Sequence, residues 1–162
     1  MSLNDLRLHR HTKSDIADNI EYLPWLQDLD YQDIFQMAGY FKAYTLEKGQ
    51  ILFEEGSHEF YMVIVYSGRV DLFKETSDEG QRVIGTMRAG KVFGELSIFD
   101  QGPRSAGARA RVDTIIYALS DESFNKMKSE NPKVALTLAL KVCRIVSQRL
   151  RQTTGQWVEL LN

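Results

Sequence analysis

Glu95 and Arg104 are the residues whose types and spacing point most clearly to binding chemistry. They stand nine positions apart within residues 93–110. Gly94 lets the backbone turn tightly or approach a ligand closely. Residues 95–99 have the length of one helical turn, whose free N–H groups and dipole favour an anion at its start. This stretch therefore predicts an anion site.

Arg104 supplies the cation that such a site needs, because a guanidinium can hold a phosphate through two parallel, charge-assisted hydrogen bonds. The small residues at 105–108 leave room for a ligand beside the backbone. The Glu95 carboxylate can accept from a hydroxyl such as a ribose 2′-OH. Together they indicate a pocket for a small phosphate-bearing ligand, which is sensed and not chemically changed. The alternative, that Glu95 is a solvated turn residue and Arg104 a surface loop charge, stays open at this point.

Short strands separated by turns must position this pocket. Residues 41–120 alternate β-rich runs with glycine-containing turns, which favours a barrel or sandwich. We expect strands at residues 41–46, 51–54, 60–66, 69–74, 81–87, 91–93, 108–112 and 114–119. The irregular stretch 94–107 interrupts the series.

Helical patterns flank the strands on both sides. Residues 1–40 read as helical, with Asp30 as an N-cap and Gly39 as a stop. Residues 121–162 begin with a short capped helix. Pro132 then starts a long helix that we expect to run to about Thr154, where Gly155 weakens or ends it.

Composition narrows the class of protein. The chain has 162 residues, a net charge of −2 and a pI of about 5.9, so it shows no sign of the basic face of a nucleic-acid binder. It lacks an apolar run long enough to span a membrane and an N-terminal secretory signal. The single cysteine, Cys143, excludes an intrachain disulfide and fits a cytoplasmic location. Three histidines and no nucleophile–base set give no basis for a metal site or an enzyme.

Residues 93–110 resemble the phosphate-binding cassette of the cyclic nucleotide-binding domain family, which carries Phe-Gly-Glu-Leu, a short helix and loop, and then Pro-Arg. The resemblance extends to Gly49 and Gly56, to the segment from Tyr61 to Leu72, and to Gly90. It implies an α+β fold: an antiparallel β-roll or jelly-roll barrel with N-terminal helices and a long C-terminal helix. The implied division is an N-terminal helical segment (1–40), the nucleotide-binding β-roll (41–120) and the C-terminal helices (121–162).

The same resemblance implies roles for individual residues. Glu95 would bind the ribose 2′-OH, and Arg104 would bind the cyclic phosphate with help from backbone N–H groups. The cassette residues expected to contact phosphate and ribose are Gly94, Glu95, Leu96, Ser97, Arg104, Ser105 and Ala106. The residues expected to form the pocket wall and to contact the base are Leu72, Ile84, Gly85, Arg149, Thr153 and Thr154.

The identity of the base depends on two places in the chain. Ser105 follows the cassette arginine, where kinase families tend to have Ala for cAMP and Thr for cGMP, so this position is ambiguous. Residues 149–154 are similar to the helix of the catabolite activator proteins in which a Thr-Ser pair contacts adenine. Here the pair is Thr153-Thr154, which favours cAMP as the ligand, with cGMP possible.

The long helix carries two apolar stripes, which imply two packing partners. One stripe follows a heptad and predicts a homodimer contact: Ala139, Cys143, Val146, Leu150, Thr153, Trp157 and Leu160. The other, Val134, Leu138, Val142 and Ile145, is placed to pack on the barrel. The alternative is that both stripes of the helix pack against a single core within the same chain.

The catabolite activators continue into a DNA-binding domain where this chain stops, so we expect no DNA binding and no membrane contact. The chain is then either a stand-alone sensor or a fragment of something longer, and its downstream protein partner is unknown. A nucleotide-independent interaction domain with the same fold, or a sensor of another small anion, is the competing hypothesis.

Overall fold

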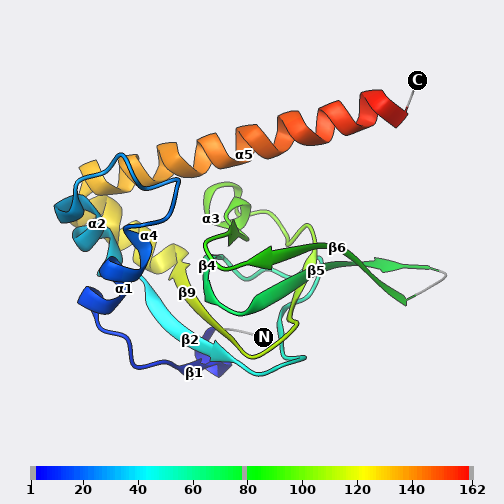
Figure 1. Cartoon of the computed structure of the whole chain (residues 1–162), viewed down its shortest axis with the longest axis horizontal. Helices are drawn as coiled ribbons and strands as arrows, with labels where there is room; N and C mark the ends of the chain where they lie inside the picture. The colour runs from blue at the N-terminus through cyan, green and yellow to red at the C-terminus, as the bar shows by residue number, and fades with distance from the viewer. Residues whose placement is uncertain (1–2, 78–79, 161–162) are drawn as a thin grey trace.

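A long helix lies across a two-sheet β-structure in the computed structural model, which describes residues 3–77 and 80–160, with side chains to residue 155 (Figure 1). The helices are η1 (Leu3–Asp5), α1 (Lys13–Ile20), α2 (Tyr31–Ala38), α3 (Leu96–Asp100), α4 (Asp121–Glu130) and α5 (Pro132–Leu160). The strands are β1 (Arg7–Leu8), β2 (Lys42–Leu46), β3 (Ile51–Phe53), β4 (Tyr61–Ser67), β5 (Arg69–Thr76), β6 (Gly80–Arg88), β7 (Val92–Phe93), β8 (Gly107–Ala110) and β9 (Thr114–Ser120).

The strands form two antiparallel sheets. Sheet A has the order β1-β2-β9-β4-β7, and sheet B has the order β3-β8-β5-β6. Strands close in sequence often belong to different sheets, as in a jelly roll, and the expected antiparallel β-roll with flanking helices is confirmed. All of the expected strands are present, with ends that differ by one or two residues.

Sheet A is apolar on both faces, which explains the nearly continuous apolar run of β4. Alternate residues of β4, such as Val63 and Val65, pack between the two sheets. Met62 and Ile64 face the other way and join a cluster built mainly from α1, α2, α4 and α5. The N-terminal and C-terminal helices therefore share one hydrophobic cluster on the outer face of sheet A.

Two local expectations need correction. Helix α5 continues past Gly155 to Leu160, since one glycine costs only about 1 kcal/mol and does not end a helix by itself. The N-terminal segment is not wholly helical, because Arg7 and Leu8 pair with β2 as strand β1. Strand β6 carries one extra residue, Ile84, where the register with β5 shifts, whereas the pairing of β5 with β8 is regular. Phe73 therefore lies on the face of β5 opposite Leu72, where it is fully buried.

A search of the described helices for one that is both long and apolar enough to cross a membrane finds none.

Candidate functional site

The cassette backbone turns sharply between β7 and α3. Gly94 follows the last residue of β7 with a φ of 71°, a left-handed conformation that suits glycine. A Cβ at this position would lie 2.7 Å from Nη1 of Arg104 and 3.2 Å from the carbonyl oxygen of Tyr61. Gly94 thus provides both the turn and the space for the arginine.

Arg104 points into the protein and is 4% exposed. Its Nη1 donates to the carbonyl oxygen of Gly94 (2.8 Å) and to Oγ of Ser97 (2.9 Å), and its Nη2 donates to the carbonyl oxygen of Tyr61 (2.8 Å). The guanidinium carbon lies 3.9 Å from the ring centroid of Phe53 and 4.4 Å from that of Tyr61. These cation–π contacts and hydrogen bonds fix the guanidinium at the start of the cassette.

Burial has the largest effect on the pKa values of Arg104 and Tyr61. It lowers the pKa of Arg104, and the charges of Tyr61, Glu59 and Glu95 partly oppose that effect. It also raises the pKa of the Tyr61 hydroxyl, which donates to the carbonyl oxygen of Leu52. An arginine side chain stays charged in proteins, so the site holds a buried positive charge.

Glu95 is also buried, at 4% exposed, and it contacts α5 directly. Its Oε1 accepts from Nη1 of Arg149 at 2.6 Å, and Nη2 of the same arginine donates to the carbonyl oxygen of Val92. The ion pair therefore joins the cassette to the long helix.

Two atoms of these charged side chains have no hydrogen-bond partner. Among the described residues, only three buried side-chain nitrogen or oxygen atoms lack one: Nε of Arg104, Oε2 of Glu95 and Nε1 of Trp25. Leaving such a group unsatisfied costs about 1–3 kcal/mol, and more for a charged group. The cassette thus keeps one unused donor and one unused acceptor.

The expected pocket wall lies on sheet B beside the cassette. Leu72 pairs with Ala108 on one side and with Gly85 on the other, so these three residues form one row across β8, β5 and β6. Ile84 stands at the register shift and is 56% exposed. Ser105 and Ala106 form a bend just before β8, outside the strand ladder.

The expected base-contacting residues on α5 fall into two groups. Arg149 reaches the cassette, as described above. Thr153 and Thr154 are exposed, and their hydroxyls donate to the carbonyl oxygens of Arg149 (3.0 Å) and Leu150 (2.9 Å) within the helix. This structure does not bring the two threonines to the cassette.

The expected dimer seam is partly covered by the chain itself. Ala139 and Val146 are partly buried against the chain's own helical core, beside the second stripe. Cys143 and Leu150 of the seam are exposed, as are Leu136 and Leu140, which lie outside it. The side chains of Trp157 and Leu160 lie outside the described part of the chain.

The sequence patterns do not single out Phe53, and they place Tyr61 only within a family segment. Both stack on Arg104 from strands far away in sequence. The usable signal was the presence of aromatic residues at the end of one strand and the start of the next, on either side of the turn at Gly56. That turn is hydrogen-bonded to Arg104 through Gly56 and Ser57.

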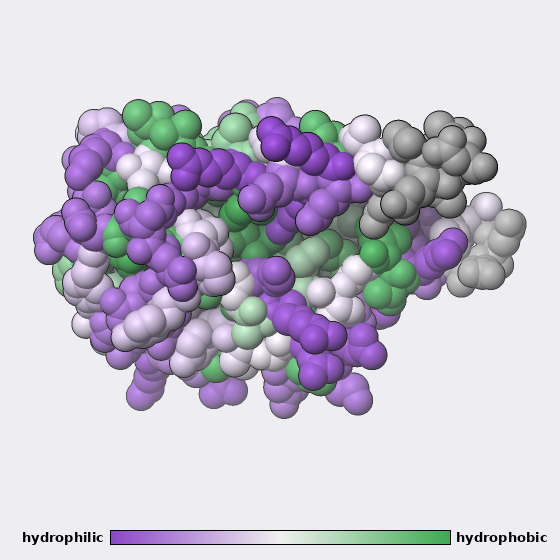
Figure 2. Space-filling view, turned by 45° about the horizontal axis from the view of Figure 1, so that its top comes forward, coloured by the Kyte–Doolittle hydropathy of each residue, from purple (hydrophilic) through white to green (hydrophobic). Residues whose placement is uncertain are grey.

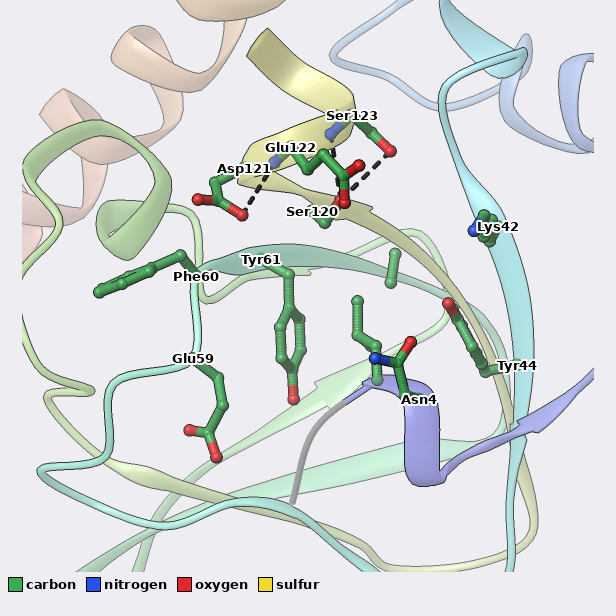
Figure 3. A pocket seen from close by; sticks show the side chains of 12 residues that line it. Asn4, Lys42, Tyr44, Glu59, Phe60, Tyr61, Ser120, Asp121, Glu122 and Ser123 are labelled. Carbon is green, nitrogen blue, oxygen red and sulfur yellow. Dashed lines mark hydrogen bonds between the residues drawn. The ribbon is translucent and has the colours of Figure 1, made fainter. Parts of the chain in front are cut away.

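The surface near α5 is hollowed. Figure 2 shows a recess along this helix where hydrophobic residues gather between hydrophilic rims. A separate cavity of about 250 Å³ lies where α4 begins, lined by residues that include Lys42, Tyr44, Tyr61 and Ser120 (Figure 3). None of the described residues that line this cavity belongs to the cassette. A search of the described residues finds no group of three or more side chains that could hold a metal ion.

Comparisons with known proteins agree with this geometry. The family model described as "Cyclic nucleotide-binding domain" matches residues 44–131, more than half of the chain. The chain is 30% identical over 129 residues to the Cyclic AMP receptor protein of Thermus thermophilus, covering 80% of this chain and 58% of that protein. The chain thus spans little more than half the length of this curated relative.

Solved structures show the same fold. A cyclic nucleotide-binding domain from Methylobacillus flagellatus superposes with a TM-score of 0.77 at 22% identity, covering 89% of this chain and 81% of that one. The Thermus thermophilus Catabolite Activator Protein superposes with a TM-score of 0.72 at 29% identity, covering 85% and 62%.

Proposed function

Because the chain belongs to the cyclic nucleotide-binding domain family, we propose that it senses cAMP through its cassette and signals through α5. Arg104 binds the cyclic phosphate, together with the backbone N–H groups of Glu95, Leu96, Ser105 and Ala106. Glu95 accepts a hydrogen bond from the ribose 2′-OH. The protein acts as a regulator in the cytoplasm and not as an enzyme.

The two unsatisfied atoms in the cassette are the observation that carries this proposal. Nε of Arg104 is a buried donor, and Oε2 of Glu95 is a buried acceptor. A ligand that brings an anionic oxygen to the first and a hydroxyl to the second offsets both desolvation penalties. A cyclic nucleotide has these two groups close together, on the phosphate and on the ribose.

The contact between Glu95 and Arg149 supports a role for α5 in the response. Glu95 accepts from Arg149 through one oxygen and leaves the other for the ligand. A ribose that binds the free oxygen therefore binds the same carboxylate that holds Arg149, so ligand binding and the position of α5 are coupled through Glu95. The ligand shifts α5 only as far as it binds one position more tightly than the other.

The residues on α5 beyond Arg149 favour adenine as the base. Thr153 and Thr154 lie one turn further along the helix, and their hydroxyls are exposed. In the proposed bound state they turn from the helix carbonyls to the base, which requires α5 to move or a second subunit to contribute. The similarity to a cyclic AMP receptor protein supports this choice of ligand over cGMP.

The exposed leucines of α5 support a homodimer. Leu136, Leu140 and Leu150 are 62%, 54% and 66% exposed, and they recur at spacings of four and ten residues on one face of the helix. Burying a leucine side chain contributes about 1.5–3 kcal/mol, so a second copy of α5 packed on this stripe would be stabilised.

A nucleotide titration of wild-type protein and two variants tests the function. Arg104→Ala removes the phosphate contact, and a hydrogen bond to a charged group contributes about 1.5–3 kcal/mol, so cAMP should bind at least tenfold more weakly. The ribose contact is tested with 2′-deoxy-cAMP, which wild type should bind about tenfold more weakly than cAMP. Glu95→Ala should bind the two nucleotides equally. Circular dichroism of each variant shows whether it is folded. If folded Glu95→Ala still prefers cAMP over 2′-deoxy-cAMP as strongly as the wild type does, the role assigned to Glu95 is refuted.

A second candidate function is a nucleotide-independent interaction domain. It is favoured by the contacts of Arg104, whose two terminal nitrogens already bond to Gly94, Ser97 and Tyr61 within the protein. In that case the arginine serves only to hold the cassette. A melting temperature that does not change with any cyclic nucleotide, together with a stable protein partner in a pull-down, would favour this function over the first.

A further inference from the structure

Three arginines form a row on the outer face of sheet B. Arg69 on β5 stands directly opposite Arg88 on β6. On its other side, the N–H of Arg111 donates to the carbonyl oxygen of Arg69 across the β5–β8 pairing. Their neighbours Val70, Met87 and Ala110 pack into the core between the sheets. Because side chains alternate along a strand, the three arginines point away from that core.

The next row of the same face adds one more positive charge and one negative charge. Asp71 lies between Thr86 on β6 and Arg109 on β8. It is 9% exposed, accepts from Oγ1 of Thr86 at 2.6 Å, and lies 3.7 Å from Nη1 of Arg111. These two rows of described residues thus carry four arginines around one largely buried carboxylate.

The chain itself does little to neutralise this surface, which we call the arginine face (Arg69, Arg88, Arg109 and Arg111). In the part of the chain that the structure describes, Arg111 is the one member within 4 Å of a carboxylate. Arg109 donates to the amide oxygen of Gln81. Nearby, Asp113 accepts from the backbone N–H of Lys48. Like charges directly opposite each other on paired strands destabilise a sheet, so the Arg69–Arg88 pair has a cost that an anionic partner would remove.

We propose that the arginine face binds an acidic helix of a partner protein. The row Arg88–Arg69–Arg111 crosses two strand spacings, about 10 Å in total. Acidic residues at positions i, i+4 and i+7 of a helix lie on one face and span about 10 Å along its axis. Guanidinium groups pair with carboxylates in a two-pronged geometry, which favours arginine over lysine here.

An open sheet face presents these groups in rows, so an extended partner fits better than a small ion. A nucleic acid would call for a broader basic surface than four residues, and the chain carries a net charge of −2. The arginine face is on the side of sheet B away from the core, so the proposal does not depend on nucleotide binding.

A peptide titration tests the proposal on the full chain. The probe is a fluorescently labelled, alanine-based peptide of about 20 residues, long enough to form a helix, with Glu at i, i+4 and i+7. A matched peptide has Gln at these three positions. Fluorescence anisotropy at low salt should show that the Glu peptide binds and that the Gln peptide does not. Added salt should weaken binding of the Glu peptide, because its ion pairs with the arginines are exposed to solvent. Arg69→Gln and Arg88→Gln should each weaken binding about two- to fivefold.

Arg82→Gln is the matched control for Arg88→Gln. Arg82 lies on the same strand, is exposed and carries the same charge. Its neighbour Gln81 bonds to Arg109 on the arginine face, so Arg82 points to the other face of the strand. Its substitution should leave peptide affinity unchanged. Equal binding of the Gln peptide, an equal loss in Arg82→Gln, or no loss in Arg88→Gln would overturn the proposal. Tighter binding of a DNA duplex through Arg88 would also overturn the choice of an acidic helix.

Discussion

Replacing Arg149 by glutamine breaks the contact between α5 and the cassette and leaves Glu95 without its charged partner. The Glu95 side chain is 5% exposed and the Arg149 side chain is 38% exposed. Removing one member of a fully buried pair costs about 3–5 kcal/mol, whereas a hydrogen bond to a charged group contributes about 1.5–3 kcal/mol. Since water reaches Arg149, we expect the smaller range, with a loss of about 2 kcal/mol in the free energy of unfolding.

A double-mutant cycle with Glu95→Gln isolates the interaction. If the two residues stabilise the fold through each other, the double variant loses less than the sum of the single variants, with a coupling energy of about 1–2 kcal/mol. The free energies come from urea unfolding followed by circular dichroism. In thermal unfolding, Arg149→Gln should lower Tm by about 4–8 °C for a chain of this size.

Arg151→Gln controls for a general effect of removing charge from α5, because Arg151 is exposed on the same helix. Its free energy of unfolding should stay within about 0.5 kcal/mol of wild type. Strictly additive losses in the cycle, or an equal loss in Arg151→Gln, would show that the Glu95–Arg149 contact contributes nothing specific. The proposed link between the cassette and α5 would then fail.

Three further outcomes follow from particular residues. Gly94→Ala should destabilise the protein by about 1–3 kcal/mol and weaken cAMP binding, because its Cβ would lie 2.7 Å from the Arg104 guanidinium at a φ of 71°; chemical unfolding and calorimetry measure both effects. Burial lowers the pKa of His11 from 6.5, so the unfolded chain binds the proton first and stability is lost as the pH falls below about 6.5. His11→Gln should reduce this loss, measured as the change in urea midpoint with pH, and an unchanged loss would refute the assignment. Leu140→Glu should shift sedimentation from dimer to monomer without altering the fold, since this side chain is 54% exposed, and an unchanged dimer would exclude this stripe as the contact.

The strands and the cassette were predictable because their signals are local. Glycine-containing turns separate short apolar runs, and each of the expected runs is a strand in the structure. The two-residue strand β1 carries no such pattern, since it depends on pairing with β2 alone. The full burial of Phe73 has no local signal either, because it depends on a distant backbone: a Cβ at Gly107 would lie 2.3 Å from the Phe73 ring.

The arrangement inside the site was not predictable from sequence, because it depends on contacts between distant segments. Arg104 bonds to Tyr61, 43 residues away, and Arg149 bonds to Glu95, 54 residues away. The sequence indicates that these side chains belong to the site, but it does not indicate that Arg104 bonds to Tyr61 or that Arg149 bonds to Glu95. The sequence shows two apolar stripes on α5, but their boundary depends on how α2 and α4 pack against the helix, which leaves Ala139 and Val146 partly buried against the core.

The heat of cAMP binding to the wild-type chain tests the central claim most directly. Isothermal titration calorimetry should show saturable binding at one site per chain, weaker binding of cGMP, and at least a tenfold loss of cAMP affinity in folded Arg104→Ala. The absence of any heat with either nucleotide up to millimolar concentration, from protein that is folded by circular dichroism, would contradict the account.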